Sequence, residues 1–128
     1  MDNWRLGSGQ LIFSMLKKQY RLTKKKDFDR LFQAADTKYY GKLVGVRIVA
    51  NGLNYNRFGL VVSRRYCRLA TERNLIKRRL ASIVKENLPK MVKGYDMVII
   101  VIAPWPLLKF NNLKQELIKI LEKLELIV

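Results

Sequence analysis

Histidine is absent from this chain of 128 residues, and Cys67 is its one cysteine. Without histidine, a Ser-His-Asp triad, a Cys-His nucleophile pair and histidine-based metal sites are excluded. A single cysteine cannot form an internal disulfide, so a reducing compartment, the cytoplasm, is the simplest location. Arg65 and Arg68 stand near Cys67 and favour its thiolate, but a chance cysteine without a role is the preferred interpretation.

Long apolar runs are also missing. The longest, residues 97–103, is much shorter than the roughly 20 residues that a helix needs to span a membrane. Residues 1–16 have one cation, Arg5, offset by Asp2, and lack the apolar stretch of a secretory signal. We expect a soluble protein that does not span a membrane, in which residues 1–16 form a dispensable N-terminal extension to a single domain at 17–128.

Acidic residues are few. Ten Asp and Glu oppose 26 Lys and Arg, which gives a formal net charge of +16 and a pI near 10.3. Hydrophobic residues make up 49% of the chain, which distinguishes it from a disordered basic tail. This charge on a folded domain indicates nucleic acid or an anionic membrane surface as the partner.

Residues 58–86 organise the chain, because a short apolar strand there leads into a basic helix. An apolar stripe marks the packed face of this helix: Ile76, Leu80, Ile83, Val84 and Leu88. Along one flank of the stripe lie Arg73, Asn74, Lys77, Arg78 and Lys85. Such a flank can be a mere solvated face, but solvated faces usually mix Glu with Lys at i,i+4 spacing. The flank therefore predicts an outward-facing cationic edge that binds phosphates.

The same segment carries a family resemblance. It contains Gly59-Leu60-Val61-Val62-Ser63-Arg64-Arg65 and, after seven residues, Arg73-Asn74-Leu75-Ile76-Lys77-Arg78. This pattern resembles the signature of the bacterial ribonuclease P protein component, and the resemblance extends from about Tyr20 to Leu124. The family pattern continues with an arginine and an acidic residue, where this chain has Ala81 and Ser82.

The resemblance implies a subunit of the ribonuclease P ribonucleoprotein, an endoribonuclease that removes 5′ leaders from precursor tRNA. It implies that the RNA is the catalyst and carries the Mg²⁺ ions, so that this chain binds no cofactor by itself. The expected partners are the catalytic RNA and precursor tRNA, and no DNA. We assign catalytic-RNA binding to Arg64, Arg65, Arg68, Arg73, Asn74, Lys77, Arg78 and Arg79. We assign the leader-binding cleft to Phe28, Phe32, Arg47 and Ser63.

Residues 27–35 form the first predicted helix. One side of it carries Phe28, Leu31, Phe32 and Ala35. Spacing leaves the two phenylalanines evenly balanced between core packing and binding. The resemblance favours binding, because this helix in the family borders the cleft for the single-stranded leader, and aromatic rings stack on any base. Lys24, Lys25 and Lys26 would oppose the helix dipole, so we expect auxiliary phosphate contacts from them.

Strand patterns follow at residues 38–40 and 43–50. A polar turn at 51–57 predicts that the second strand returns antiparallel through residues 58–63. One face of this hairpin is apolar, with Val44, Val46, Ile48, Phe58, Leu60 and Val62. The other face carries Gly45, Arg47, Gly59, Val61 and Ser63, which predicts a shallow groove for a nucleic-acid backbone, although a glycine in a strand can equally mark a bulge.

Residues 95–103 are apolar without alternation, which is typical of a strand covered on both faces. Asn112 is the expected N-cap of the last helix, with Gln115 three residues later. The fold class is therefore α+β, a two-layer sandwich in the order α-β(β)β-α-β-α. The resemblance adds a small mixed sheet with a left-handed βαβ crossover, against the general rule.

Two other functions compete with a ribonuclease P subunit. A ribosomal or other structural RNA-binding protein would have the same charge, but would associate with ribosomes and leave tRNA cleavage unchanged. A basic membrane-surface protein would need cations around an exposed apolar helix face, whereas the apolar stripes here are needed for the core, so we expect no membrane partner.

Overall fold

The computed structural model describes residues 17–34 and 37–127. Along the chain lie η2 (Lys18–Tyr20), α2 (Lys25–Ala34), β1 (Thr37–Tyr40), β2 (Val44–Ala50), β3 (Arg57–Val61), α3 (Ala70–Asn87), η3 (Leu88–Lys90), β4 (Tyr95–Val101), η4 (Trp105–Leu107) and α4 (Phe110–Lys123). This order confirms the predicted α+β sequence of elements. The proposed extension at residues 1–16 lies outside the described residues.

The four strands form one mixed sheet in the order β1-β2-β4-β3. β2 runs antiparallel to both β1 and β4, whereas β3 and β4 are parallel neighbours connected through α3. The expected hairpin between β2 and β3 is wrong, because β4 lies between them. The reason is the composition of β4: a strand that is apolar on both faces is stabilised in the interior of a sheet, where both faces can be covered.

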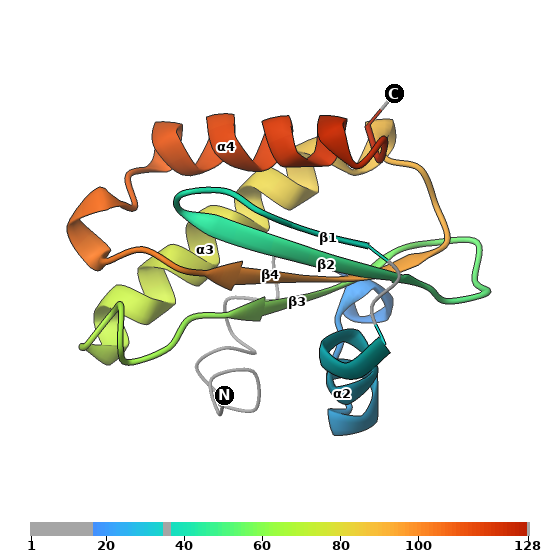
Figure 1. Ribbon diagram of the computed structural model, residues 1–128, viewed down its shortest axis with the longest axis horizontal. Coiled ribbons are helices and arrows are strands. Elements are labelled where there is room, and N and C mark those ends of the chain that lie inside the picture. Colours follow the sequence, from blue (N-terminus) through green and yellow to red (C-terminus); the bar gives the residue numbers. More distant parts are fainter. Residues whose placement is uncertain (1–16, 35–36, 128) are drawn as a thin grey trace.

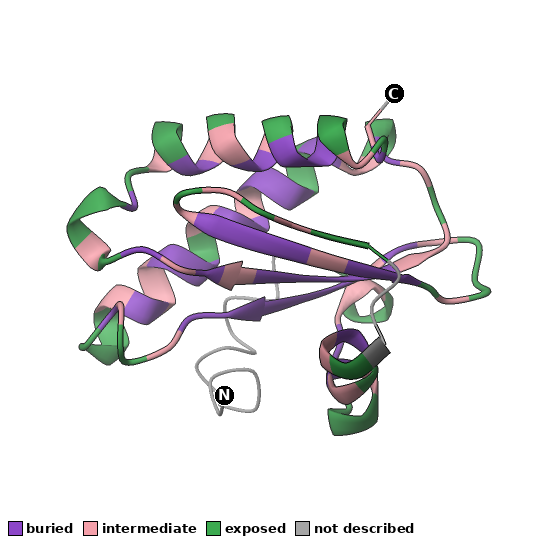
Figure 2. Cartoon of the chain, viewed as in Figure 1, coloured by how far each residue is buried: buried purple, intermediate pink, exposed green. Residues whose placement is uncertain are grey.

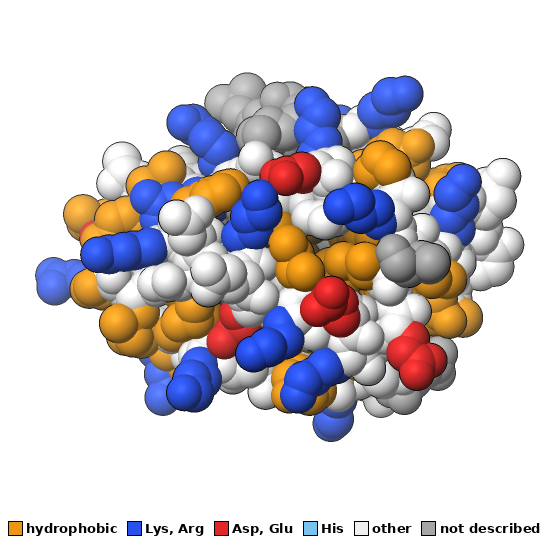
Figure 3. Space-filling view, turned by 90° about the horizontal axis from the view of Figure 1, so that it is seen from above, with side chains coloured by type: hydrophobic (Ala, Val, Ile, Leu, Met, Phe, Trp, Pro, Cys, Tyr) orange, Lys and Arg blue, Asp and Glu red, His pale blue; other side chains and the backbone are white. Residues whose placement is uncertain are grey.

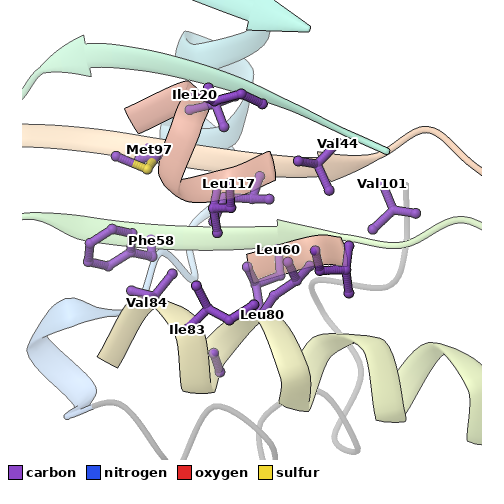
Figure 4. Close-up of a cluster of buried hydrophobic side chains, with 14 of the residues drawn as sticks. Val44, Phe58, Leu60, Leu80, Ile83, Val84, Met97, Val101, Leu117 and Ile120 are labelled. Atoms are coloured by element: carbon purple, nitrogen blue, oxygen red, sulfur yellow. The ribbon is translucent and has the colours of Figure 1, made fainter. Parts of the chain in front are cut away.

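α3 and α4 cover one face of the sheet, and α2 lies against the opposite face (Figure 1). The predicted alternation holds, since Val44, Val46, Phe58 and Leu60 all point into the main core under α3 and α4. In the close-up, side chains from α3, including Leu80 and Val84, meet Phe58 and Leu60 of β3 (Figure 4). The two-layer arrangement is confirmed, and α2 adds a partial third layer.

A second, smaller core lies between α2 and the sheet. Its buried members are Leu22, Phe28, Leu31, Val49, Val61 and Val98. Gly59 makes this packing possible, because a Cβ at that position would clash with the ring of Phe28. The glycine therefore accommodates a side chain of the protein itself.

A buried carboxylate fixes α2 and the sheet further. Asp96 in β4 is fully buried and accepts hydrogen bonds from Arg57 Nε at 2.8 Å and Arg57 Nη2 at 2.7 Å. Asn51 Nδ2 donates a third at 3.0 Å, and Arg57 Nη1 lies 3.7 Å from Asp27 of α2. The bidentate pair with Asp96 raises the pKa of Arg57. Nothing in the sequence pattern had indicated this network.

α4 packs across the main core with its outer face exposed (Figure 2). It begins at Phe110 with Lys109 as N-cap, so the expected N-cap Asn112 is wrong and lies in the first turn. Glu116 fixes the turn between β1 and β2: its carboxylate accepts the backbone N–H groups of residues 42, 43 and 44 at 2.6 to 3.0 Å. In the described part of the chain, no helix is long and apolar enough to cross a membrane.

Candidate nucleic-acid interface

Three exposed arginines, Arg64, Arg65 and Arg68, lie in the loop between β3 and α3. The loop is compact, because the Ser63 carbonyl accepts hydrogen bonds from the N–H groups of Tyr66 at 3.3 Å and Cys67 at 3.1 Å. The Arg65 guanidinium lies over the Tyr66 ring, 5.5 Å from its centroid. The loop therefore presents several cations from a defined backbone, as a phosphate-binding surface requires.

Arg73, in the first turns of α3, holds this loop from beneath. Its side chain is only 6% exposed, and Nη1 donates to the carbonyl oxygens of Cys67 and Arg68 at 3.0 Å each. At the helix start, the Glu72 carboxylate accepts the Leu69 N–H at 3.0 Å. Both contacts bind the loop to α3, so Arg73 positions the exposed arginines from within.

Lys77, one turn further along α3, is 2% exposed. Burial disfavours its charged form and, together with the charge of Arg73, lowers the pKa of Lys77 to about 8. The expected outward cationic edge is therefore wrong for Arg73 and Lys77, which lie inside. A helical wheel explains the error: at about 100° per residue, both fall within roughly 60° of Leu80 and Val84. The sequence thus contained the signal that these two cations share the packed face.

The exposed edge of α3 carries the remaining residues of the predicted flank. Arg78 and Lys85 are exposed, and Asn74 is partly exposed. Arg79 turns towards the loop before α4, where its Nη1 donates to the Leu108 carbonyl at 2.7 Å and its guanidinium lies over the Trp105 ring. The structure therefore brings Arg78 into line with Asn74 and Lys85, and separates Arg79 from them.

Ala81 and Ser82, where the family pattern differs, occupy two environments. Ala81 is fully buried in the main core, whereas Ser82 is partly exposed. A long charged side chain at position 81 would have to enter the core, so the alanine suits this packing.

Cys67 is fully buried beneath the same loop. Burial and the nearby Glu72 carboxylate raise the pKa of its thiol to about 11, and the charge of Arg73 offsets only part of this. A buried thiol with a raised pKa stays protonated at neutral pH and is a poor nucleophile. This environment agrees with the interpretation of Cys67 as a residue without a redox or catalytic role.

The sheet face beside α2 separates the two phenylalanines of the predicted cleft. Phe28 is 1% exposed and belongs to the smaller core, so its expected position in an open cleft is wrong. Phe32 is partly exposed, and the Arg47 guanidinium lies over its ring, 5.4 Å from the centroid. Arg47 also donates to the Phe32 carbonyl at 3.0 Å. Only Phe32 of the pair has ring surface at the outside.

Tyr40 was missed by the sequence analysis. It is 43% exposed, its hydroxyl accepts a hydrogen bond from Arg47 Nε at 2.8 Å, and its ring fills the space over Gly45. The rings of Tyr40 and Phe28 thus occupy the space above Gly45 and Gly59, so the groove predicted over these glycines is filled. Phe32, Arg47 and Tyr40 lie together on this sheet face, and Ser63 is partly exposed near the end of β3.

The cations before and within the first turn of α2 are all exposed. Lys25 forms an i,i+4 ion pair with Asp29 at 2.9 Å, a contact that contributes little when exposed. Lys24 and Lys26 remain available for phosphates. On the face that carries α4, Lys and Arg side chains are also numerous and acidic ones few (Figure 3). Charge alone therefore does not select one surface of this molecule.

The described residues contain no group of three His, Cys, Asp or Glu side chains placed to hold a metal ion.

The Ribonuclease P family model matches residues 16–125. The chain belongs to the ribonuclease P protein family.

Individual relatives agree with this family. The ribonuclease P protein component of Pseudanabaena sp. is 31% identical over 110 residues, which cover 85% of this chain and 94% of that protein. The solved ribonuclease P protein of Thermotoga maritima is 28% identical, with a TM-score of 0.71 over 80% of this chain and 96% of its own. The Staphylococcus aureus protein, 22% identical with a TM-score of 0.77 over 85% of this chain and 98% of its own, shows the shared fold.

Proposed function

We propose that this chain is the protein subunit of a bacterial ribonuclease P ribonucleoprotein and helps its RNA remove 5′ leaders from precursor tRNA. The observation that carries the proposal is the family match over residues 16–125. The geometry supports it, because the signature residues build a cationic loop on a rigid base. The RNA is proposed to carry the catalytic Mg²⁺ ions, and the cytoplasm is the proposed location.

Within the signature, the residues divide into two groups. Exposed side chains are proposed to contact the catalytic RNA: Arg64, Arg65, Arg68, Asn74 and Arg78. Arg73 and Lys77 are proposed to act through the fold, since buried cations cannot reach a phosphate without rearrangement. Arg79 falls between these two groups. Its guanidinium donates to the Leu108 carbonyl, but the residue is partly exposed.

The leader is proposed to bind on the sheet face beside α2. Phe32 and Tyr40 supply ring surface for stacking, and Arg47, held between them, supplies positive charge. Phe28 supports this surface from below. Lys24 and Lys26 extend positive charge from the start of α2.

The test is reconstitution of cleavage. The purified protein is added to a bacterial ribonuclease P RNA transcript and a precursor tRNA at an Mg²⁺ concentration at which the RNA alone is nearly inactive. We expect the protein to restore cleavage at the mature 5′ end. Arg78→Met should weaken this effect, while Lys93→Met, an exposed cation outside the signature, should not. A protein that binds RNA without stimulating cleavage, or that sediments with ribosomes, would contradict the proposal.

A further inference from the structure

Two loops at one end of the molecule are joined into one surface. The β3–α3 loop carries Arg65 and Tyr66, and the β4–α4 loop carries η4 with Trp105 (Figure 1). The backbone N–H of Trp105 donates a hydrogen bond to the backbone carbonyl of Tyr66 at 2.9 Å. Arg79 of α3 holds the β4–α4 loop as well, because it donates to the Leu108 carbonyl at 2.7 Å. The two loops therefore hold each other in a fixed arrangement.

Aromatic rings and arginines alternate on this surface. The Arg79 guanidinium lies 5.8 Å from the centroid of the Trp105 ring, and the Arg65 guanidinium 5.5 Å from that of Tyr66. We call these four residues the loop platform: Arg65, Tyr66, Arg79 and Trp105. Beside them Leu69 is 57% exposed and Leu107 53%, more than any other large hydrophobic side chain of the described residues. Aromatic, arginine and exposed apolar groups in two joined loops are typical of a binding surface.

The positive charge around the loop platform favours RNA over protein as its partner. Arg64 and Arg68 add two exposed cations, and the nearby acid, Glu72, already accepts the Leu69 N–H. A protein partner would have to be strongly acidic, whereas RNA supplies both the negative charge and the flat rings. Unpaired bases of RNA stack on aromatic side chains and on arginine guanidinium planes. The platform is also continuous with the arginine loop that Arg73 positions.

We propose that the loop platform stacks an unpaired base of the ribonuclease P RNA, with Trp105 as the main ring. This inference rests on the proposed function and adds to it a stacking contact by Trp105 and Tyr66, which belong neither to the signature helix nor to the leader cleft. η4 is thereby part of the RNA interface. The base would pack beside Trp105 and Tyr66, while its flanking phosphates pair with Arg65 and Arg79.

Tryptophan fluorescence tests the contact directly. The sequence has two tryptophans, Trp4 and Trp105, so a Trp4→Phe variant leaves Trp105 as the one reporter. This variant is titrated with a bacterial ribonuclease P RNA transcript, and assembly is measured in parallel by filter binding. Stacking on a base should quench Trp105 fluorescence at the same RNA concentrations at which assembly occurs. A fully base-paired RNA duplex should bind without this quenching.

Substitutions at Trp105 separate stacking from packing. Trp105→Phe keeps an aromatic face and should retain most of the affinity for the RNA, whereas Trp105→Leu should lose on the order of tenfold. Tyr55→Leu is the matched control, because Tyr55 is a partly buried tyrosine in the loop between β2 and β3, and this loop lies at the opposite end of the molecule from the β4–α4 loop (Figure 1). It should leave RNA affinity unchanged. Melting temperatures are measured for all three variants.

The outcomes distinguish this inference from the proposed function. If the Trp4→Phe variant assembles with the RNA and restores cleavage but its Trp105 fluorescence stays constant, the loop platform does not contact RNA and only the inference fails. Equal losses for the Phe and Leu variants would likewise overturn it. If the parent neither assembles nor stimulates cleavage, the proposed function itself fails. The fluorescence experiment needs no substitution at Trp105, so an unstable Leu variant leaves the test intact.

Discussion

The buried lysine of α3 should make the stability of this protein depend on pH in an unusual range. Lys77 is 2% exposed, and its pKa lies at about 8 in place of 10.5. At about 1.4 kcal/mol per pKa unit, this depression corresponds to about 3 kcal/mol of free energy. Solvent screens the charge of Lys77 only slightly, because this side chain has almost no contact with water.

The direction follows from which state holds its proton more tightly. The unfolded chain keeps Lys77 protonated up to about pH 10.5, whereas the folded chain releases this proton near pH 8. Unfolding therefore takes up a proton between these values, and the free energy of unfolding should rise with pH across this window. Below about pH 8 the full cost of burying the charge is present.

Lys77→Met removes the charge and keeps an unbranched side chain. Urea unfolding of the parent and the variant at intervals from pH 7 to 10.5 gives the free energy of unfolding of each. Over this range, the free energy of unfolding of the parent should rise by about 3 kcal/mol relative to that of the variant, since the contributions of other titrating groups cancel in the difference. Lys85→Met, at an exposed lysine of the same helix, is the matched control. A difference between parent and Lys77→Met that does not change with pH would refute the burial of this amine.

Four further predictions follow from the placement of the signature and cleft residues. Arg73→Met should lower the free energy of unfolding, measured in urea, by about 2 to 4 kcal/mol, because the carbonyls of Cys67 and Arg68 lose a charged donor. Arg78→Met should change it by less than about 0.5 kcal/mol while weakening RNA binding. Phe28→Leu should cost stability, whereas Phe32→Leu should reduce the preference for precursor over mature tRNA by about 1 to 3 kcal/mol; equal effects of both would contradict the division. In Gly59→Ala the added Cβ should clash with the Phe28 ring, which should lower the free energy of unfolding by about 1 to 3 kcal/mol and lower the melting temperature. An unchanged melting temperature would refute that packing. The affinity of the parent for RNA should fall with salt by about 0.7 to 0.9 logarithmic units per tenfold change for each neutralised phosphate, and a flat dependence would exclude phosphate binding.

Several features of the fold could be predicted from local pattern. The alternation in β2 and β3 gave the inward faces correctly, because successive side chains of a strand point to opposite sides. The apolar stripe from Ile76 to Val84 gave the packed face of α3 in the same way. The last helix was found, but not its start, because Lys109 caps it through backbone geometry with no side-chain hydrogen bond.

The candidate site was predicted in part. The exposed arginines of the β3–α3 loop lie where their polarity suggested, since charged side chains without buried partners stay at the surface. Arg73 was misplaced although its helical spacing puts it on the packed face. A buried guanidinium needs acceptors, and only the folded loop brings the carbonyl oxygens of Cys67 and Arg68 within its reach. Tyr40 was missed because its role depends on Gly45 and Arg47 across the β1–β2 hairpin.

By itself, the sequence determined the family, the order of helices and strands, and the excess of positive charge. These depend on residue types and on spacings of a few residues, which the backbone repeats of helix and strand convert directly into faces. Tertiary structure decided the position of β4 between β2 and β3, the pairing of Arg57 with Asp96, the hydrogen bonds of Arg73 to the Cys67 and Arg68 carbonyls, and the burial of Phe28. Each of these depends on contacts between segments whose approach is set by the packing of the whole core, and no local pattern encodes that approach.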